Sequence, residues 1–243
     1  MEQLYKLSGD PIDLEDLARL FRTGSATVRK IDEHYYSGLA DWDPAQTDSD
    51  ALAIAETALT RMNAIALVRQ ENFRPPRVEG ITRRDPVTGQ PVSTMVIGAT
   101  GIEGRSRVGV PTLTFTGETA SSDQSPAFGE AVLSIADQND MLERALQVYG
   151  SKDQHTWRGL YLVYEAIKEG VGGKDGLIAL NVAPWSSIDD FKRTANSFRA
   201  IGVQSRHISG KEGNLDAKMT LPEAQTLIRQ LLDAWIKELL RSQ

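Results

Sequence analysis

Residues 117–125, GETASSDQS, separate two parts of the chain that have different hydrophobic patterns. The segment is polar and consists mostly of small residues, which is the composition of a linker. Strand-like runs come before it, and helical periodicity follows it. We therefore expect an α+β protein of two domains, with residues 1–118 as the first domain, 119–125 as the linker and 126–243 as the second domain.

The first domain is expected to combine an antiparallel sheet with two helices. Helical patterns cover residues 13–22 and about 48–70, and the second pattern stops before Pro75 and Pro76. A turn at residues 85–89, DPVTG, predicts a hairpin between the runs on either side of it. The β-rich runs are residues 5–7, 26–36, 78–84, 92–97 and 106–115.

We expect the second domain to be a bundle of about four helices. Amphipathic patterns cover residues 126–149, 151–169, 187–200 and 220–243. Thr220 and Glu223 have the spacing of a capping box at the start of the last helix.

Composition excludes several classes of protein. The chain has 243 residues and no cysteine, which excludes a disulfide framework, a thiolate metal site and a thiol nucleophile. It has three histidines, His34, His155 and His207, so we expect no histidine-rich metal centre and no cofactor. Neither a signal peptide nor a stretch approaching 18 apolar residues is found. We therefore expect a cytoplasmic protein without membrane contact.

Arginine is concentrated in one part of the chain. Residues 61–110 contain eight arginines, no lysine and four acidic residues, so this segment carries +4 although the chain carries −6. Arginine suits planar anions such as phosphate or carboxylate. We take Arg83, Arg84, Arg105 and Arg107 as candidates for an anion-binding surface, and a strand surface of solvated arginines is the alternative.

Two glycine-rich stretches resemble phosphate loops without the surroundings that such loops need. Residues 96–104, VIGATGIEG, contain a GATGxxG pattern, but the β-rich run after them leaves no place for the required helix. Residues 170–176, GVGGKDG, have no Ser or Thr after Lys174. We interpret the first as a turn between strands and the second as a flexible connection between helices.

A polar stripe is predicted on the third helix of the bundle. Lys192, Asn196 and Arg199 recur at helical spacing, and Arg206 and His207 follow within a few residues. Histidine suits acid–base chemistry near neutral pH, and arginine can hold a phosphate. We therefore take Asn196, Arg199, Arg206 and His207 as candidate catalytic residues.

A second pair of polar residues lies on the second helix. Arg158 and Glu165 are two turns apart and share a flank, so we take both as candidate binding residues. In a purely structural alternative, Glu165 pairs with an arginine inside the bundle and His207 caps a loop.

Several segments of the second domain resemble a known group of proteins. Residues 157–165 (WRGLYLVYE), 191–196 (FKRTAN), 205–207 (SRH) and 219–223 (MTLPE) are similar to the C-terminal helical part of many uncharacterised bacterial proteins. In style they are similar to HEPN-type helical domains, which occur in bacterial toxin and abortive-infection proteins. The resemblance covers residues 126–243 and is one of pattern.

Catalytic HEPN domains share an arginine and a histidine separated by four to six residues. In this chain seven residues separate Arg199 from His207, and Gly202 interrupts the helix between them. Arg29 and His34 fit the spacing but lie in a predicted strand, so we interpret them as a chance match. The resemblance therefore implies a helical fold more than it implies ribonuclease activity.

Two functions of different classes follow as hypotheses. The first is a non-catalytic binding or adaptor module for an unknown protein or for an anionic ligand, RNA included. The alternative is a metal-independent endoribonuclease, with His207 as acid and base, Arg199 and Arg206 as phosphate ligands and Asn196 orienting the substrate. The acidic net charge argues against avid non-specific binding of nucleic acid. A small-molecule enzyme or sensor is a third hypothesis. The sequence is also compatible with a homodimer.

Overall fold

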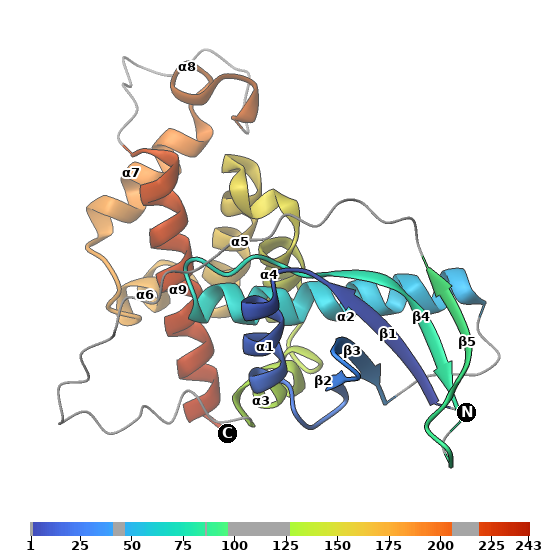
Figure 1. The fold of residues 1–243 in the computed structure, drawn as a ribbon. Helices are drawn as coiled ribbons and strands as arrows, with labels where there is room; N and C mark the ends of the chain where they lie inside the picture. The colour runs from blue at the N-terminus through green and yellow to red at the C-terminus, as the bar shows by residue number, and fades with distance from the viewer. Residues whose placement is uncertain (1, 41–46, 86, 97–126, 206–218) are drawn as a thin grey trace, which may run out of the picture. The chain divides into compact units, whose positions relative to one another are not determined.

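The computed structural model describes residues 2–40, 47–85, 87–96, 127–205 and 219–243 of the chain. A five-stranded antiparallel sheet with helices occupies the N-terminal half, and helices form the C-terminal half (Figure 1). The predicted α+β class is therefore confirmed.

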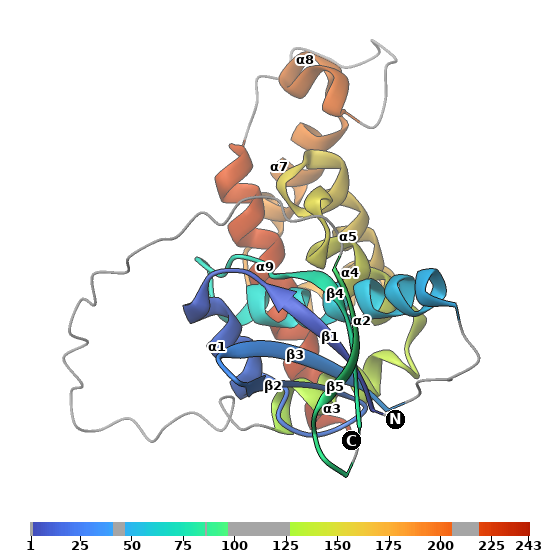
Figure 2. The same ribbon diagram turned by 45° about the vertical axis from the view of Figure 1, so that its right-hand side comes forward.

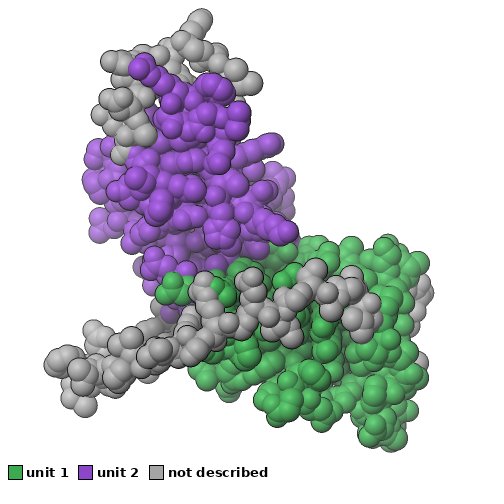
Figure 3. All heavy atoms as spheres, turned by 45° about the horizontal axis from the view of Figure 1, so that its top comes forward, with its two compact units in different colours: residues 1–66, 72–131 green, residues 67–71, 132–243 purple. Residues whose placement is uncertain are grey.

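The chain divides into two compact units (Figure 3). The first contains Met1–Ala66 and Asn72–Ala131, and the second contains Leu67–Glu71 and Val132–Gln243. The boundaries fall within and just after helix α2 (Asp48–Arg69) and within helix α3 (Ala127–Ala136). The predicted linker at 119–125 and the predicted strand at 106–115 lie outside the described residues.

The sheet of the first unit has the strand order β2-β3-β1-β4-β5. Its strands are β1 (Glu2–Ser8), β2 (Ala26–Ile31), β3 (His34–Leu39), β4 (Arg77–Arg84) and β5 (Pro91–Val96). The central strand is β1, in which Tyr5 lies opposite Ser37 of β3 and Ile81 of β4. The edge strands are therefore β2 and β5.

The prediction of one strand at residues 26–36 is wrong, because the chain turns back within it. β2 and β3 form a hairpin around Asp32 and Glu33, whose φ angles are 47° and 66°. Two left-handed residues in succession make a tight turn that matches the twist of the strands, and Asn-Gly is its usual sequence. Asp-Glu is a weak signal for such a turn. Because the residues on both sides favour β structure, the pattern predicts one continuous strand instead of a hairpin.

Two predicted helices complete the first unit. α1 (Pro11–Leu20) begins at Asp10, whose carboxylate accepts a hydrogen bond from the N–H of Ile12 at 2.9 Å. α2 runs along one face of the sheet (Figures 1 and 2). Asn63 on α2 donates to the carbonyl oxygen of Pro76 at 3.0 Å, which joins the helix to the segment before β4.

By length and composition, α2 is the one helix in the described residues that is apolar enough to cross a membrane. The sequence predicts no membrane-spanning stretch, because none approaches 18 consecutive apolar residues. In the structure, 56% of its most apolar 18-residue window is buried, and a core helix meets the same criteria. The C-terminal half of α2 is buried, which is sufficient to explain the composition.

Beyond residue 126 the described chain forms helices joined by turns. They are α3, α4 (Asp140–Gly150), the 3-10 helix η2 (Lys152–His155), α5 (Trp157–Gly170), α6 (Lys174–Ala179), α7 (Trp185–Asn196), α8 (Phe198–Ile201), the 3-10 helix η3 (Gly202–Gln204) and α9 (Leu221–Arg241). The short α6 begins inside residues 170–176, so the prediction of a flexible connection there is wrong from Lys174 onward.

Three of the four predicted helices are interrupted where a polar side chain caps a new helix. The side chains of Asn139, Thr156 and Ser197 each accept a backbone N–H of the following turn, and they start α4, α5 and α8. The fourth helix, α9, begins with the predicted capping box of Thr220 and Glu223.

The core of the second unit is built around α5, which packs against α4 and α9. Leu160, Val163 and Ile167 are fully buried on one side of α5. At its end, a Cβ on Gly170 would lie 2.1 Å from the indole ring of Trp235 on α9, so the two helices touch closely there. The opposite side of α5, which carries Arg158, is left exposed.

Candidate functional site

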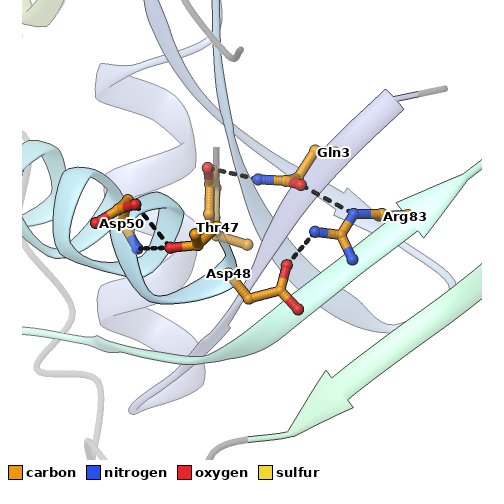
Figure 4. A network of polar contacts seen from close by, with 6 residues as sticks. Gln3, Thr47, Asp48, Asp50 and Arg83 are labelled. Atoms are coloured by element: carbon orange, nitrogen blue, oxygen red, sulfur yellow. Dashed lines mark hydrogen bonds and ion pairs between the residues drawn. The ribbon is translucent and has the colours of Figure 1, made fainter. Parts of the chain in front are cut away.

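The predicted binding residue Arg83 lies on β4 and is held by residues of its own unit. Its Nε donates to Oε1 of Gln3 at 3.1 Å, and its Nη2 forms an ion pair with Asp48 at the start of α2 (Figure 4). Beside this pair, the hydroxyl of Thr47 donates to Asp50 at 2.7 Å. The guanidinium of Arg83 is therefore neutralised by a carboxylate that the fold holds in place.

Gln3 connects this ion pair to a buried phenol. Its Nε2 donates to the hydroxyl oxygen of Tyr5 at 2.9 Å, and both side chains are buried. Burial raises the pKa of Tyr5, and this outweighs the hydrogen bond from Gln3 and the charge of Arg83, which both lower it. Tyr5 therefore stays neutral near pH 7 and acts as a structural hydrogen-bond partner.

The other predicted arginines of this surface were Arg84, Arg105 and Arg107. Arg84 pairs with Asp32 of the β2–β3 turn, from Nη2 to Oδ2 at 3.1 Å, and its side chain is 14% exposed. Arg105 and Arg107 lie outside the described residues. An anion that approached β4 would therefore have to compete with Asp48 for Arg83 and with Asp32 for Arg84.

A cleft of about 620 Å³ opens in the second unit. One side of the cleft consists of Asp153 from η2, Thr156 between η2 and α5, and four residues of α5: Arg158, Tyr161, Leu162 and Glu165. The remaining lining comes from Ala195 of α7 and from Val203, Gln204 and Ser205 after α8. The structure thus brings Arg158 and Glu165 to one site, together with the segment that follows the third predicted helix.

The start of α5 fixes the shape of this cleft. The hydroxyl of Thr156 donates to the carbonyl oxygen of Asp153 at 2.8 Å and accepts from the N–H of Gly159 at 3.0 Å. A Cβ on residue 159 would lie 1.9 Å from the same carbonyl oxygen, so only glycine lets η2 approach α5 this closely. Asp153 and Arg158 therefore lie on either side of a close contact between η2 and the first turn of α5, which forms one corner of the cleft.

Aromatic rings form a layer between α5 and α7. The ring of Phe191 on α7 stacks on Trp157 and Tyr161 of α5, with centroid distances of 6.1 and 6.2 Å. Tyr164 meets the same ring edge-on at 5.6 Å. Because Phe191 is fully buried and Tyr161 is half-buried, the layer extends from the core to the lining of the cleft.

The hydroxyl of Tyr164 lies inside this layer without a hydrogen-bond partner among the described residues. Burial, followed by the nearby Tyr161, Glu165 and Asp189, raises the pKa of Tyr164 to about 12. Tyr164 is therefore neutral at physiological pH, and it offers no base to the neighbouring cleft.

Two charged side chains of the cleft, Arg158 and Asp153, make no hydrogen bond or ion pair within the described residues. Both are exposed. Two apolar residues of the lining are exposed as well, Leu162 at 43% and Val203 at 91%. Among the described residues, no three His, Asp or Glu side chains gather as a metal site would require. The cleft therefore offers charge and apolar surface together.

The predicted catalytic residues are not gathered in the described part of this cleft. Arg199 is exposed on α8, and the amide of Asn196 donates to the carbonyl oxygen of Lys192 at 2.8 Å within its own helix. Neither Arg199 nor Asn196 lines the cleft. Arg206 and His207 lie outside the described residues.

Some lining residues were missed by the sequence reasoning. Tyr161 is half-buried and lines the cleft close to Arg158 on the same helix. Leu162 lies between Arg158 and Glu165 on the same flank, so helical spacing alone would have found it. Val203 and Gln204 belong to a short 3-10 turn, which has no periodicity to reveal it.

Comparisons with family models, with curated proteins and with solved structures found no match for this chain. The resemblance to HEPN-type domains stays a prediction, and the function has to be inferred from the geometry of the cleft.

Proposed function

We propose that this chain is a non-catalytic binding module that holds its partner in the cleft of the second unit. The supporting observation is that Arg158 and Asp153, which have no partner among the described residues, line the same cleft as the exposed Leu162 and Val203. Charged groups that the fold leaves unpaired can pair with another molecule, and exposed apolar surface gains from being covered. The cleft suits a ligand that carries charge next to an apolar group.

A segment of a protein chain fits this description better than a polyanion does. Among the described residues that line the cleft, Asp153 and Glu165 carry carboxylates and only Arg158 carries a guanidinium, so closely spaced phosphates would meet more negative than positive charge there. A peptide can place an acidic group at Arg158 and an apolar side chain against Leu162 and Val203. This supports the adaptor function over binding of nucleic acid.

Two hydroxyl groups, that of Thr156 in the lining of the cleft and that of Tyr164 in the aromatic layer beside it, favour binding over catalysis. The Thr156 hydroxyl is committed to the cap of α5, where it both donates and accepts. Tyr164, with its pKa raised to about 12, cannot serve as a base near neutral pH. Neither group has the activation that a nucleophile or a general base needs.

Selection of random peptides displayed on phage, with the full chain as bait, tests this function. Enriched peptides, made synthetically and labelled, should bind in fluorescence anisotropy, and Arg158→Ala should weaken them about tenfold because a charged hydrogen bond is lost. Arg193→Ala is the matched control, since Arg193 is exposed on α7, pairs with Asp189 and does not line the cleft. If no peptide is enriched, or if both variants bind equally, the proposal is wrong.

The metal-independent endoribonuclease is kept as a second candidate because of one observation. Ser205 lines the cleft, and Arg206 and His207 follow it directly in the sequence. The proposed acid–base and phosphate-binding groups are therefore neighbours, along the chain, of a residue of the cleft. The carboxylate of Asp153, which has no partner among the described residues, weighs against this candidate, since it repels a phosphate backbone.

Incubation of the full chain with labelled single-stranded RNA in EDTA separates the two candidates. The binding module is expected to leave the RNA intact. Cleavage that is lost in His207→Ala, reduced in Arg199→Ala and dependent on pH between about 5 and 8 would instead establish the ribonuclease. The His207→Ala variant, purified in the same way, also controls for contaminating ribonuclease.

A further inference from the structure

The two edges of the sheet differ in how they are protected. On β2, Arg29 and Lys30 are exposed, and they pair with Glu2 and Glu33. Charged side chains on an edge strand oppose the addition of another strand, because the charges would have to lose their water. The β2 edge is therefore protected against pairing.

The opposite edge, β5, has no such protection in the described residues. Its sequence, PVSTMV, contains no charged residue. Val92, Ser93 and Thr94 are all exposed, Val92 at 58%. Successive residues of a strand point to opposite faces, so β5 has exposed side chains on both faces, and no described strand pairs with its outer edge. A strand with these properties is a template for pairing with another chain.

The hairpin that carries β5 is already held in shape. Asp85 accepts hydrogen bonds from the N–H groups of Val87 and Thr88 at 2.8 and 2.9 Å, and its own N–H donates to the carbonyl oxygen of Gln90 at 2.9 Å. On the other side, β5 pairs with β4 from Pro91 to Val96. A strand that is ordered before it binds loses less conformational entropy when a partner adds to it.

We infer that β5 is an interaction surface for β5 of a second copy of this chain, with the two strands antiparallel across a two-fold axis. Such an axis places residues of the same strand opposite one another, so the strand must be complementary to itself. An uncharged strand meets this condition in any register, whereas β2 would bring Arg29 and Lys30 of the two copies together. The uncharged edge thus favours a second copy over a partner recognised by charge. This inference concerns the first unit and goes beyond the proposed function.

The expected interface is small. Pro91 has no N–H to donate, so the pairing extends from about Val92 to the end of the strand. Interfaces of this size are weak, since they bury less area than a stable complex needs. The dimer should therefore form as the concentration rises and should separate on dilution.

Sedimentation velocity of the full chain over about a hundredfold range of concentration tests this inference. The mass should rise from monomer toward dimer, and Thr94→Lys should move the midpoint to at least about tenfold higher concentration. Val87→Lys is the matched control, because it adds the same charge to the turn of the same hairpin at a side chain that is 92% exposed. That variant should dimerise like the wild type. Circular dichroism verifies that both variants are folded.

Cross-linking then locates the interface, since the chain has no cysteine of its own. Single cysteines at Ser93 or Thr94 should form disulfide-linked dimers under mild oxidation, and Val87→Cys should form about tenfold less. A protein that stays monomeric at every concentration would overturn the inference. An extended segment of another protein would then be the remaining candidate to pair with β5. A dimer that Thr94→Lys does not weaken, or equal cross-linking at all three positions, would overturn it as well.

Discussion

Arg83 of β4 and Asp48, the first residue of α2, form an ion pair between residues 35 positions apart in the sequence. The same guanidinium donates to Gln3 of β1 (Figure 4). One side chain therefore joins two strands to the start of the helix beside them. In the sequence Arg83 belongs to an excess of arginine that suggests free positive charge, whereas in the structure its charge is used within the fold.

Arg83→Glu should therefore destabilise the protein. It places two carboxylates side by side and leaves Oε1 of Gln3 without its donor, so we expect a loss of about 1–3 kcal/mol in the free energy of unfolding. Urea denaturation followed by circular dichroism measures this loss. Arg22→Glu is the control, because Arg22 is exposed and has no ion pair among the described residues; it should change stability by less than about 0.5 kcal/mol. Equal effects of the two variants would show that the Arg83 contacts contribute nothing.

Gly159→Ala should disturb the corner of the cleft. Its Cβ would lie 1.9 Å from the carbonyl oxygen of Asp153, so either η2 moves away or α5 loses its first turn. Overpacking of this kind costs about 1–3 kcal/mol or more, measured as a fall in thermal and urea stability. Lys168→Ala, at an exposed position of the same helix, should have almost no effect. A Gly159→Ala protein as stable as the wild type would mean that η2 can shift without cost.

Several elements could be predicted from the sequence because their signals are local. The capping box of Thr220 and Glu223 and the turn before β5 follow from residue types at fixed spacings. The breaks at Asn139 and Ser197 were missed because the apolar periodicity continues across them. A single capping residue is a weaker signal than a helical pattern that extends over several turns. The hairpin at Asp32 and Glu33 was missed because strand pairing imposes the left-handed conformation on both residues, and glutamate rarely adopts it.

The cleft was predictable only in part, for a related reason. Arg158 and Glu165 share a flank of one helix, and helical spacing is enough to place them together. Val203 and Ser205 reach the cleft because the chain folds back after α8, and no local pattern encodes that return. The charge of Arg83 could not be judged either, since its partner Asp48 is distant in the sequence.

Tyr164→Phe tests whether the buried hydroxyl is needed. Because this hydroxyl has no partner among the described residues, its removal should leave stability near pH 7 unchanged or slightly higher. The pKa of Tyr164 is raised from 10.0 to about 12, so its ionisation does not affect stability below pH 10 and lowers the stability of the wild type as the pH rises from 10 toward 12, where the phenol ionises more readily in the unfolded chain. The variant should therefore lose less stability than the wild type between pH 10 and 12, as measured by urea denaturation across that range. A loss of more than about 1 kcal/mol at pH 7 would reveal a hydrogen-bond partner of Tyr164.

The capping box of α9 gives a prediction at acid pH. The N–H of Thr220 donates to the carboxylate of Glu223 at 2.7 Å, and its hydroxyl donates at the same distance. The backbone hydrogen bond is the larger cause, and together the two contacts lower the pKa of Glu223. Thr220→Ala removes the hydroxyl and keeps the N–H, so the pKa of Glu223 should rise only part of the way to its ordinary value. NMR titration of the side-chain carboxyl carbon measures this change.

The same substitution should lower the melting temperature at pH 7, because α9 loses the side chain that accepts the N–H of Glu223. A carboxyl with a lowered pKa contributes stability above its ordinary value of 4.5, and this contribution is lost as the pH falls through the lowered pKa. The difference between wild type and Thr220→Ala should therefore shrink in acid, where Glu223 becomes protonated and its hydrogen bonds weaken. Thr226→Ala, inside the same helix and away from the cap, should leave the titration of Glu223 unchanged. If Thr220→Ala does not change the pKa of Glu223, the hydrogen bond from the Thr220 hydroxyl to the Glu223 carboxylate does not form in solution.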